Sequence, residues 1–212
     1  MNEKFFDLKK EKQDRMINAA LKVFALNGYR HASTDDIVRE AAISKGLLFH
    51  YFGSKLGVYA FVYDYSVRYL LLELSTAVDG KETDLFTLMQ QVETGKMHAM
   101  CGYPYLQPFL NRAQAENVSE ALVAVEERKQ QMEAAFENIY AGADLEKYAS
   151  AEDVLKLRKM LELTIRGLMN ERILEDAYQP EMLYEEIVEY LQLSRRLAER
   201  SGQPSEEVTE EK

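Results

Sequence analysis

Apolar residues recur at intervals of three and four along nearly the whole chain, a spacing that places them on one face of an α-helix. Only 4 proline and 10 glycine residues interrupt it among 212 residues, and no segment shows the alternation typical of a β-strand. The sequence therefore predicts an all-α protein. A clear example is the segment 9–27, whose apolar face consists of Ile17, Ala20, Leu21, Phe24 and Ala25.

Capping and turn residues divide this pattern into separate helices. Ser33, Ser44, Ser54 and Ser150 are suited to cap amino ends, and Gly28 is suited to end the first helix in a left-handed conformation. We expect helices over about 9–27, 33–42, 44–52, 55–78 and 84–101, a short helix between the Gly102–Pro104 break and residue 116, and helices over about 119–140, 150–176 and 180–200.

Several classes of protein are disfavoured. No apolar run approaches the ~18–20 residues that span a bilayer, and the acidic first residues do not resemble a signal peptide, so we expect a cytoplasmic protein. Cys101 is the single cysteine, which excludes an intrachain disulfide. His98 and Cys101 are too few for a structural zinc site, and no catalytic motif is found. We expect no enzyme activity, no metal and no cofactor.

The two short helices at about 33–42 and 44–52 are joined by a turn of two or three residues, which is the arrangement of a helix-turn-helix unit. The second helix of such a unit lies in the major groove of DNA. Leu48 and Phe52 are four residues apart, so we expect them to pack inward on Ile37 and Ala41. The outer surface then carries Lys45, Gly46, Leu47, His50 and Tyr51.

These outer residues are suited to contact DNA. Lys45 can donate to guanine or phosphate, Leu47 can contact a thymine methyl group, and Gly46 permits close approach of the backbone. His50 and Tyr51 can hydrogen-bond phosphates. The charge distribution agrees, because residues 1–56 carry a net charge of +3 and residues 57–212 a net charge of −13. The alternative is a helical hairpin without a role on DNA.

The segment from about residue 10 to 60 resembles the tetracycline-repressor (TetR) family of bacterial regulators. The resemblance rests on Ser33-Thr34, Ile37, Ala41, Ser44-Lys45-Gly46, Leu48-Phe49-His50-Tyr51-Phe52 and Ser54-Lys55, and on the preceding Ala19-Ala20, Phe24, Gly28 and Tyr29. It implies a homodimer of all-helical subunits, in which three amino-terminal helices bind a palindromic operator. It also implies a divergent carboxy-terminal domain with a small-molecule pocket.

Carried onto this sequence, the resemblance implies DNA contacts by Thr34, Lys45, Gly46, Leu47, His50 and Tyr51, and a phosphate contact by Lys55. One position departs from the family pattern. Gly57 stands where an acidic residue is common at the third position of the fourth helix, so we expect a weakened capping box at Ser54 and a frayed helix start.

The remaining helices contain aromatic and methionine residues that are candidates for a pocket lining. An interior of this kind suits a small, mostly apolar effector. Ordinary core packing is the alternative for each residue. Asn111 and Arg112 are candidates to fix a polar end of the ligand or are simply surface residues. The candidates are Phe86, Met89, Met97, Met100, Tyr103, Tyr105, Phe109, Phe136, Tyr140 and Met160.

The last two predicted helices carry more apolar surface than one shell of a small bundle requires. We expect them to form a four-helix dimer interface, with burial inside the monomer as the alternative. The residues concerned are Leu155, Met160, Leu161, Leu163, Ile165, Leu168, Met169, Ile173, Leu183, Ile187, Val188, Leu191 and Leu197.

Together these features predict a helix-turn-helix DNA-binding domain over residues 1–55, a ligand-binding and dimerisation domain over 56–201, and a disordered acidic tail over 202–212. The predicted function is a homodimeric DNA-binding regulator, a repressor that an effector releases from a palindromic operator. The alternative is a helical small-molecule-binding or scaffold protein that does not bind DNA.

Overall fold

The computed structural model describes residues 3–148, 150–175 and 178–200, and these residues are almost entirely helical. The predicted acidic tail at 202–212 lies outside them. The all-α prediction is confirmed. The helices are η1 (Glu3–Phe5), α1 (Lys10–His31), α2 (Thr34–Glu40), α3 (Lys45–Phe52), α4 (Lys55–Ala77), α5 (Leu85–Gly102), α6 (Leu106–Gln114), α7 (Ser119–Ala141), η2 (Leu145–Lys147), α8 (Ala151–Arg172) and α9 (Pro180–Arg200).

The serine residues that were predicted to cap helices do so. Ser33, Ser44, Ser54 and Ser150 each accept a hydrogen bond from a backbone N–H two or three residues later, at 3.0–3.2 Å. Gly28 has a positive φ of 66° and interrupts α1 where the break was predicted, although one further turn follows it. These local signals explain why the helix boundaries could be read from the sequence.

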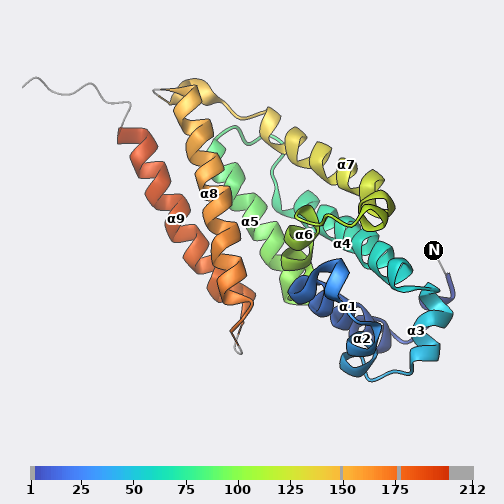
Figure 1. Cartoon of the computed structure of the whole chain (residues 1–212). Coiled ribbons are helices and arrows are strands. Elements are labelled where there is room, and N and C mark those ends of the chain that lie inside the picture. Colours follow the sequence, from blue (N-terminus) through green and yellow to red (C-terminus); the bar gives the residue numbers. More distant parts are fainter. Residues whose placement is uncertain (1–2, 149, 176–177, 201–212) are drawn as a thin grey trace, which may run out of the picture.

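Helices α1–α3 form a head at one end of the molecule, and α4 leads from it into the body (Figure 1). The head is not a separate core. Buried residues of α1–α3 belong to the same apolar cluster as residues of α4, α6 and α7, among them Phe24, Leu48, Leu70 and Phe109. A second cluster joins α5 to α8 and α9. The head and the body therefore share one apolar core.

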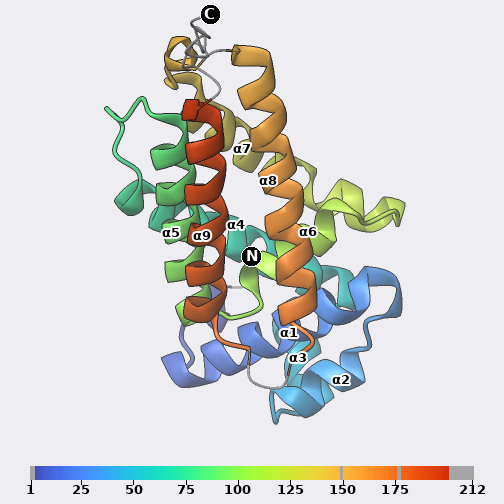
Figure 2. The same cartoon turned by 90° about the vertical axis from the view of Figure 1, so that its left-hand side faces the viewer.

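Helices α8 and α9 lie side by side across one face of the molecule (Figure 2). Part of the apolar surface of these two helices is buried within the monomer. Leu161, Ile165 and Met169 of α8 and Leu183, Ile187 and Leu191 of α9 are buried within the chain. Other apolar residues of the two helices remain 38–75% exposed, namely Leu155, Met160, Leu163, Leu174, Met182, Tyr190, Leu193 and Leu197.

Phe5 was not singled out in the sequence, yet its side chain is fully buried. Its ring lies 5.7 Å from that of Tyr51, 5.3 Å from that of Phe52 and 4.9 Å from that of Phe61, measured between centroids. The segment before α1 therefore completes the apolar contact between α3 and α4.

Gly57 permits a close approach at the start of α4. A Cβ atom at this position would lie 1.9 Å from the Phe52 carbonyl oxygen, at the end of α3. The Ser54 hydroxyl nevertheless accepts the Gly57 N–H at 3.0 Å, so the cap persists without an acidic residue. The departure from the family pattern thus allows α3 and α4 to meet closely.

We predict that Gly57→Ala destabilises the protein by about 1–3 kcal/mol, because the added methyl group must displace backbone. The matched control is Gly46→Ala, where an added Cβ meets no atom within 4 Å. This control should raise stability by up to about 1 kcal/mol through helix propensity. Urea denaturation measures both, and equal midpoints for the two variants would contradict the close approach.

Candidate functional site

The inner side of the α2–α3 unit is packed as predicted. Ile37, Ala41 and Leu48 are almost completely buried. Phe52 packs between Phe5 and Phe61 instead of entering the centre of the head. Because both inward positions of α3 are held by apolar contacts, the rotation of α3 about its own axis is fixed.

The outer side of α3 is open to solvent. Lys45, Gly46 and His50 are exposed, and Leu47 and Tyr51 are half-buried at its edge. Tyr51 rests on Phe5 and keeps one side of its ring outward. Thr34, half-buried, begins α2 on the neighbouring helix. The structure thus brings these six residues to one two-helix unit that can face a DNA groove.

Lys45 is not alone on this surface. Its Nζ atom lies 2.8 Å from Oδ1 of Asp35 on α2, and both side chains are at least half exposed. An exposed pair of this kind contributes only about 0–1 kcal/mol, so a phosphate can replace the carboxylate. The pair therefore keeps the Lys45 ammonium group beside Asp35 of α2 when no phosphate is bound.

Lys55 occupies a different position from the other predicted DNA contacts. Its ammonium group donates to the carbonyl oxygens of Tyr29 at 2.9 Å and Ala32 at 3.2 Å. It also lies 4.5 Å from the centre of the Tyr29 ring. In this arrangement Lys55 binds the end of α1 to the start of α4.

The end of α1 is held by the turn between α6 and α7 as well. The Tyr29 N–H donates to Oε2 of Glu116 at 2.9 Å, and the Tyr29 hydroxyl donates to Oε1 of Glu120 at 2.6 Å. Burial, reinforced by the Glu120 bond, raises the pKa of Tyr29 to about 12, so the hydroxyl remains a donor at neutral pH.

The start of α1 is bound to the segment before α6. Tyr103, predicted to line a pocket, instead donates its hydroxyl to Oδ1 of Asp14 at 2.6 Å. The Tyr103 hydroxyl oxygen also accepts from Nζ of Lys10 at 3.0 Å and lies 2.7 Å from the Tyr65 hydroxyl oxygen. Burial raises the pKa of Tyr103. Residues just before and just after α6 therefore bind the start and the end of α1.

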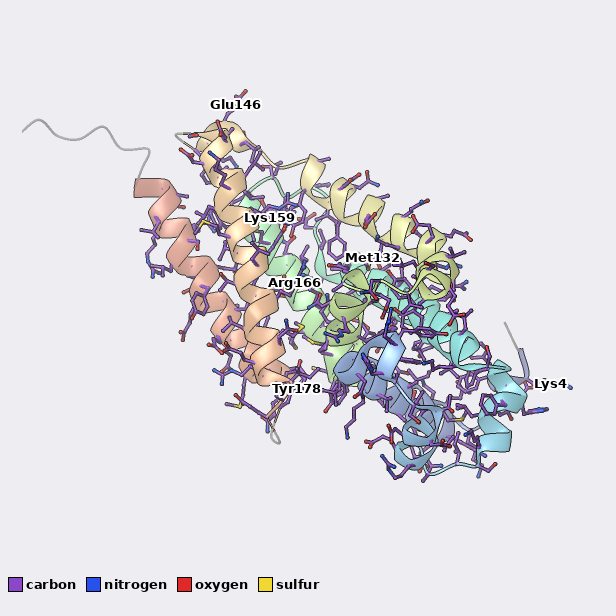
Figure 3. The ribbon with its side chains drawn as sticks, in the orientation of Figure 1. Lys4, Met132, Glu146, Lys159, Arg166 and Tyr178 are labelled. Atoms are coloured by element: carbon purple, nitrogen blue, oxygen red, sulfur yellow. The ribbon has the colours of Figure 1, made fainter. Side chains whose placement is uncertain are left out.

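A cavity of about 290 Å³ lies between α7 and α8, above α5 and α6. Figure 3 labels Met132 of α7 and Arg166 of α8, which both line it. Charged and amide side chains outnumber apolar ones in its wall. The lining residues are Met89, Glu93, Lys96, Gln107, Asn111, Gln114, Met132, Glu133, Phe136, Glu137, Tyr140, Arg158, Glu162, Ile165, Arg166 and Met169.

Only three of the ten predicted lining residues, Met89, Phe136 and Tyr140, line this cavity. The structure does not bring the other seven together. Phe86 contacts Tyr148 edge-to-face, Met97 contacts Cys101, and Met100 accepts from Tyr178. Tyr103 joins α1, Tyr105 lies beside Lys22, Phe109 packs in the shared core, and Met160 is 63% exposed.

The described ranges contain neither a metal-binding cluster nor a membrane-spanning helix. No three His, Cys, Asp or Glu side chains there are arranged to hold a metal ion. None of the helices in these ranges is both long enough and apolar enough to cross a membrane.

Residues 16–60 match the model of the tetR family of bacterial regulatory proteins. The chain is 37% identical over 78 residues to YuxN, an uncharacterized HTH-type transcriptional regulator of Bacillus subtilis (strain 168). That match covers 35% of this chain and 26% of YuxN, so the chain spans about a quarter of the relative's length.

Solved structures resemble the whole fold. A TetR family transcriptional regulator from Chloroflexus aurantiacus J-10-FL aligns with a TM-score of 0.55 and 24% identity, over 93% of each chain. A putative tetR family regulator from Shewanella sp. PV-4 aligns with a TM-score of 0.51 and 19% identity, over 91% of this chain and 98% of that one. At these identities the likeness concerns the fold.

The junction between head and body should weaken in acid. Burial alone would raise the pKa of Glu116, but backbone N–H groups, including that of Tyr29, hold it below its ordinary value of 4.5. A lowered folded pKa means that the carboxylate stabilises the fold above about pH 4.5, and that this contribution disappears as the pH falls through the folded value.

We therefore predict that Glu116→Gln is less stable than the parent protein at neutral pH and that the difference narrows on acidification. Urea denaturation from pH 7 to about pH 3 measures this. The control is Glu127→Gln, at an exposed carboxylate of α7. A constant difference between parent and Glu116→Gln across this pH range would contradict the assignment.

Proposed function

We propose that this chain, whose residues 16–60 match the tetR family of bacterial regulatory proteins, is a homodimeric, DNA-binding repressor that leaves a palindromic operator when a small effector binds. The observation that carries the proposal is the surface of α3. Its inward residues are fixed by apolar packing, while Lys45, Gly46 and His50 remain exposed on a helix of the correct size for the major groove.

The proposed contacts divide into two kinds. Lys45, Gly46 and Leu47, at the amino end of α3, approach base edges. Thr34, His50 and Tyr51 flank them and bind the phosphate backbone. The contacts of Lys55 with the carbonyl groups after α1 favour a positioning role for this residue over a phosphate contact.

The proposed dimer uses the exposed apolar residues of α8 and α9. On α8, Met160 and Leu163 are three residues apart on one helix face, and Gly167 follows Leu163 one turn later. Exposed apolar side chains of this number, gathered on two adjacent helices, favour a four-helix interface between two copies. Two α3 helices about 34 Å apart would then match half-sites on successive turns of DNA.

The proposed response to an effector runs through α6. Gln107, Asn111 and Gln114 line the cavity, whereas Arg112 lies against Gly28 of α1. A ligand that binds one arrangement of α6 more tightly shifts the position of α1 and of the helices attached to it. By linkage, the ligand weakens DNA binding only by its difference in affinity for the two arrangements.

We predict that Lys45→Ala combined with Tyr51→Phe weakens binding to a selected palindromic duplex by about 2 kcal/mol or more, roughly 30-fold. Phenylalanine keeps the ring that rests on Phe5 and removes only the hydroxyl. Asp35→Asn should strengthen binding, because it frees Lys45 and removes a negative charge. Fluorescence anisotropy at several salt concentrations measures these affinities.

The matched control for this experiment is Lys159→Ala, which removes an exposed cation from the body. Unchanged affinity of the double variant would exclude α3 as the docking surface. If the folded dimer binds no duplex from a randomised pool, the alternative of a binding or scaffold protein without DNA recognition is favoured.

A second prediction concerns the dimer. Leu163→Glu combined with Leu193→Glu should convert it to a monomer, because two charges per subunit would be buried in the interface. The control is Leu72→Glu on α4, where leucine is 62% exposed away from α8 and α9. Analytical ultracentrifugation distinguishes the species, and a double variant that remains dimeric would rule out this face.

A further inference from the structure

The cavity between α7 and α8 contains more charge than an apolar ligand would require. Two of its cations are neutralised from within. Lys96 lies 2.7 Å from Glu93, and both side chains are largely buried. Arg158 lies 2.9 Å from Glu162, with its guanidinium 4.0 Å from the centre of the Tyr140 ring. These two pairs have no net charge, and the other charged side chains of the wall are Glu133 and Glu137 of α7 and Arg166 of α8.

Arg166 differs from the other two cations. It lines the same cavity from α8, and it forms no ion pair within the part of the chain that the structure describes. Figure 3 labels it beside α8. A guanidinium group presents parallel N–H donors that match the two oxygens of a carboxylate.

A second polar group in the wall of the cavity is the side chain of Gln107. Its side chain is only 7% exposed and lines the cavity from α6. The Nε2 atom donates to Asn111 at 2.9 Å, whereas Oε1 is buried and has no hydrogen-bond partner among the described residues. An unmatched buried acceptor costs about 1–3 kcal/mol. A donor on a bound ligand would recover this cost after the Gln107 amide turns its buried Oε1 atom toward the cavity.

We infer that the cavity binds a small carboxylate that also carries an N–H or O–H donor. The carboxylate pairs with Arg166, the donor reaches Oε1 of Gln107, and the body of the ligand contacts Phe136 and Tyr140. A volume of about 290 Å³ is at the lower end of the range for ligand pockets, about 300–1,000 Å³, so the ligand is small. This inference rests on the proposed effector site and replaces the mostly apolar ligand expected from the sequence.

Calorimetry with four aromatic probes tests the inference without DNA. The probes are 4-aminobenzoate, benzoate, 4-aminobenzamide and 4-(aminomethyl)aniline. The full-length protein should bind 4-aminobenzoate at least tenfold more tightly than 4-aminobenzamide, a difference of about 1.4 kcal/mol. Arg166→Met should remove that preference, whereas Lys159→Met, on the same helix and outside the lining, should retain it.

Gln107→Leu separates the role of the donor. This variant should bind 4-aminobenzoate no more tightly than benzoate, while the parent protein distinguishes them. Circular dichroism checks that each variant is folded. Equal binding of 4-aminobenzoate and 4-aminobenzamide, tighter binding of the cationic 4-(aminomethyl)aniline, or no binding of any probe at millimolar concentration would overturn the inference.

A separate anisotropy measurement with the selected duplex keeps this inference distinct from the proposed function. If 4-aminobenzoate binds with the expected dependence on Arg166 but does not release DNA, the ligand class stands and the effector role fails. If DNA is bound and another compound releases it while no carboxylate enters the cavity, the proposed function stands and the inference fails.

Discussion

Tyr29 joins the head to the body through three polar contacts, which add to the apolar core that the two parts share. It follows the break in α1 at Gly28, where backbone groups leave the helical pattern and need other partners. Its N–H is bound by Glu116, its carbonyl by Lys55 and its hydroxyl by Glu120. Three segments that are distant in sequence thus meet at Tyr29. They are the end of α1, the start of α4 at Lys55, and the segment that contains Glu116 and Glu120.

Because the other end of α1 is bonded to Tyr103, α6 is attached to α1 at both of its ends. The order of these contacts along the two helices is the same, so α1 and α6 run in parallel and are packed together. One face of α6 packs on the head, and the other lines the cavity through Gln107 and Asn111. This packing explains how a small change in the cavity could alter the orientation of α3 without passing through a flexible linker.

The sequence predicted the helices well, because caps such as Ser33 and Ser44 are local signals and the inward face of α3 follows from spacing alone. The composition of the cavity was not predictable in this way. In a bundle where most helices contact several others, periodicity identifies an apolar face but not which neighbour it meets. Phe109 and Met89 have the same pattern, yet one packs beneath α1 and the other lines the cavity. Buried charges such as Glu93 resemble surface residues in the sequence, because their partner Lys96 lies on the same helix.

In the proposed DNA complex, the electrostatics of α3 contribute little affinity and leave discrimination between sites to the contacts with bases. The head carries a net charge of only +3, and the remainder carries −13, so general attraction to phosphate is weak. Lys45 must also exchange Asp35 for a DNA group, which subtracts the energy of the pair from every complex. A non-specific site offers a phosphate in return, whereas a cognate site also offers base acceptors and a groove that fits the exposed backbone at Gly46. The same ion pair therefore opposes both kinds of binding equally, but only the cognate complex has additional contacts that offset it.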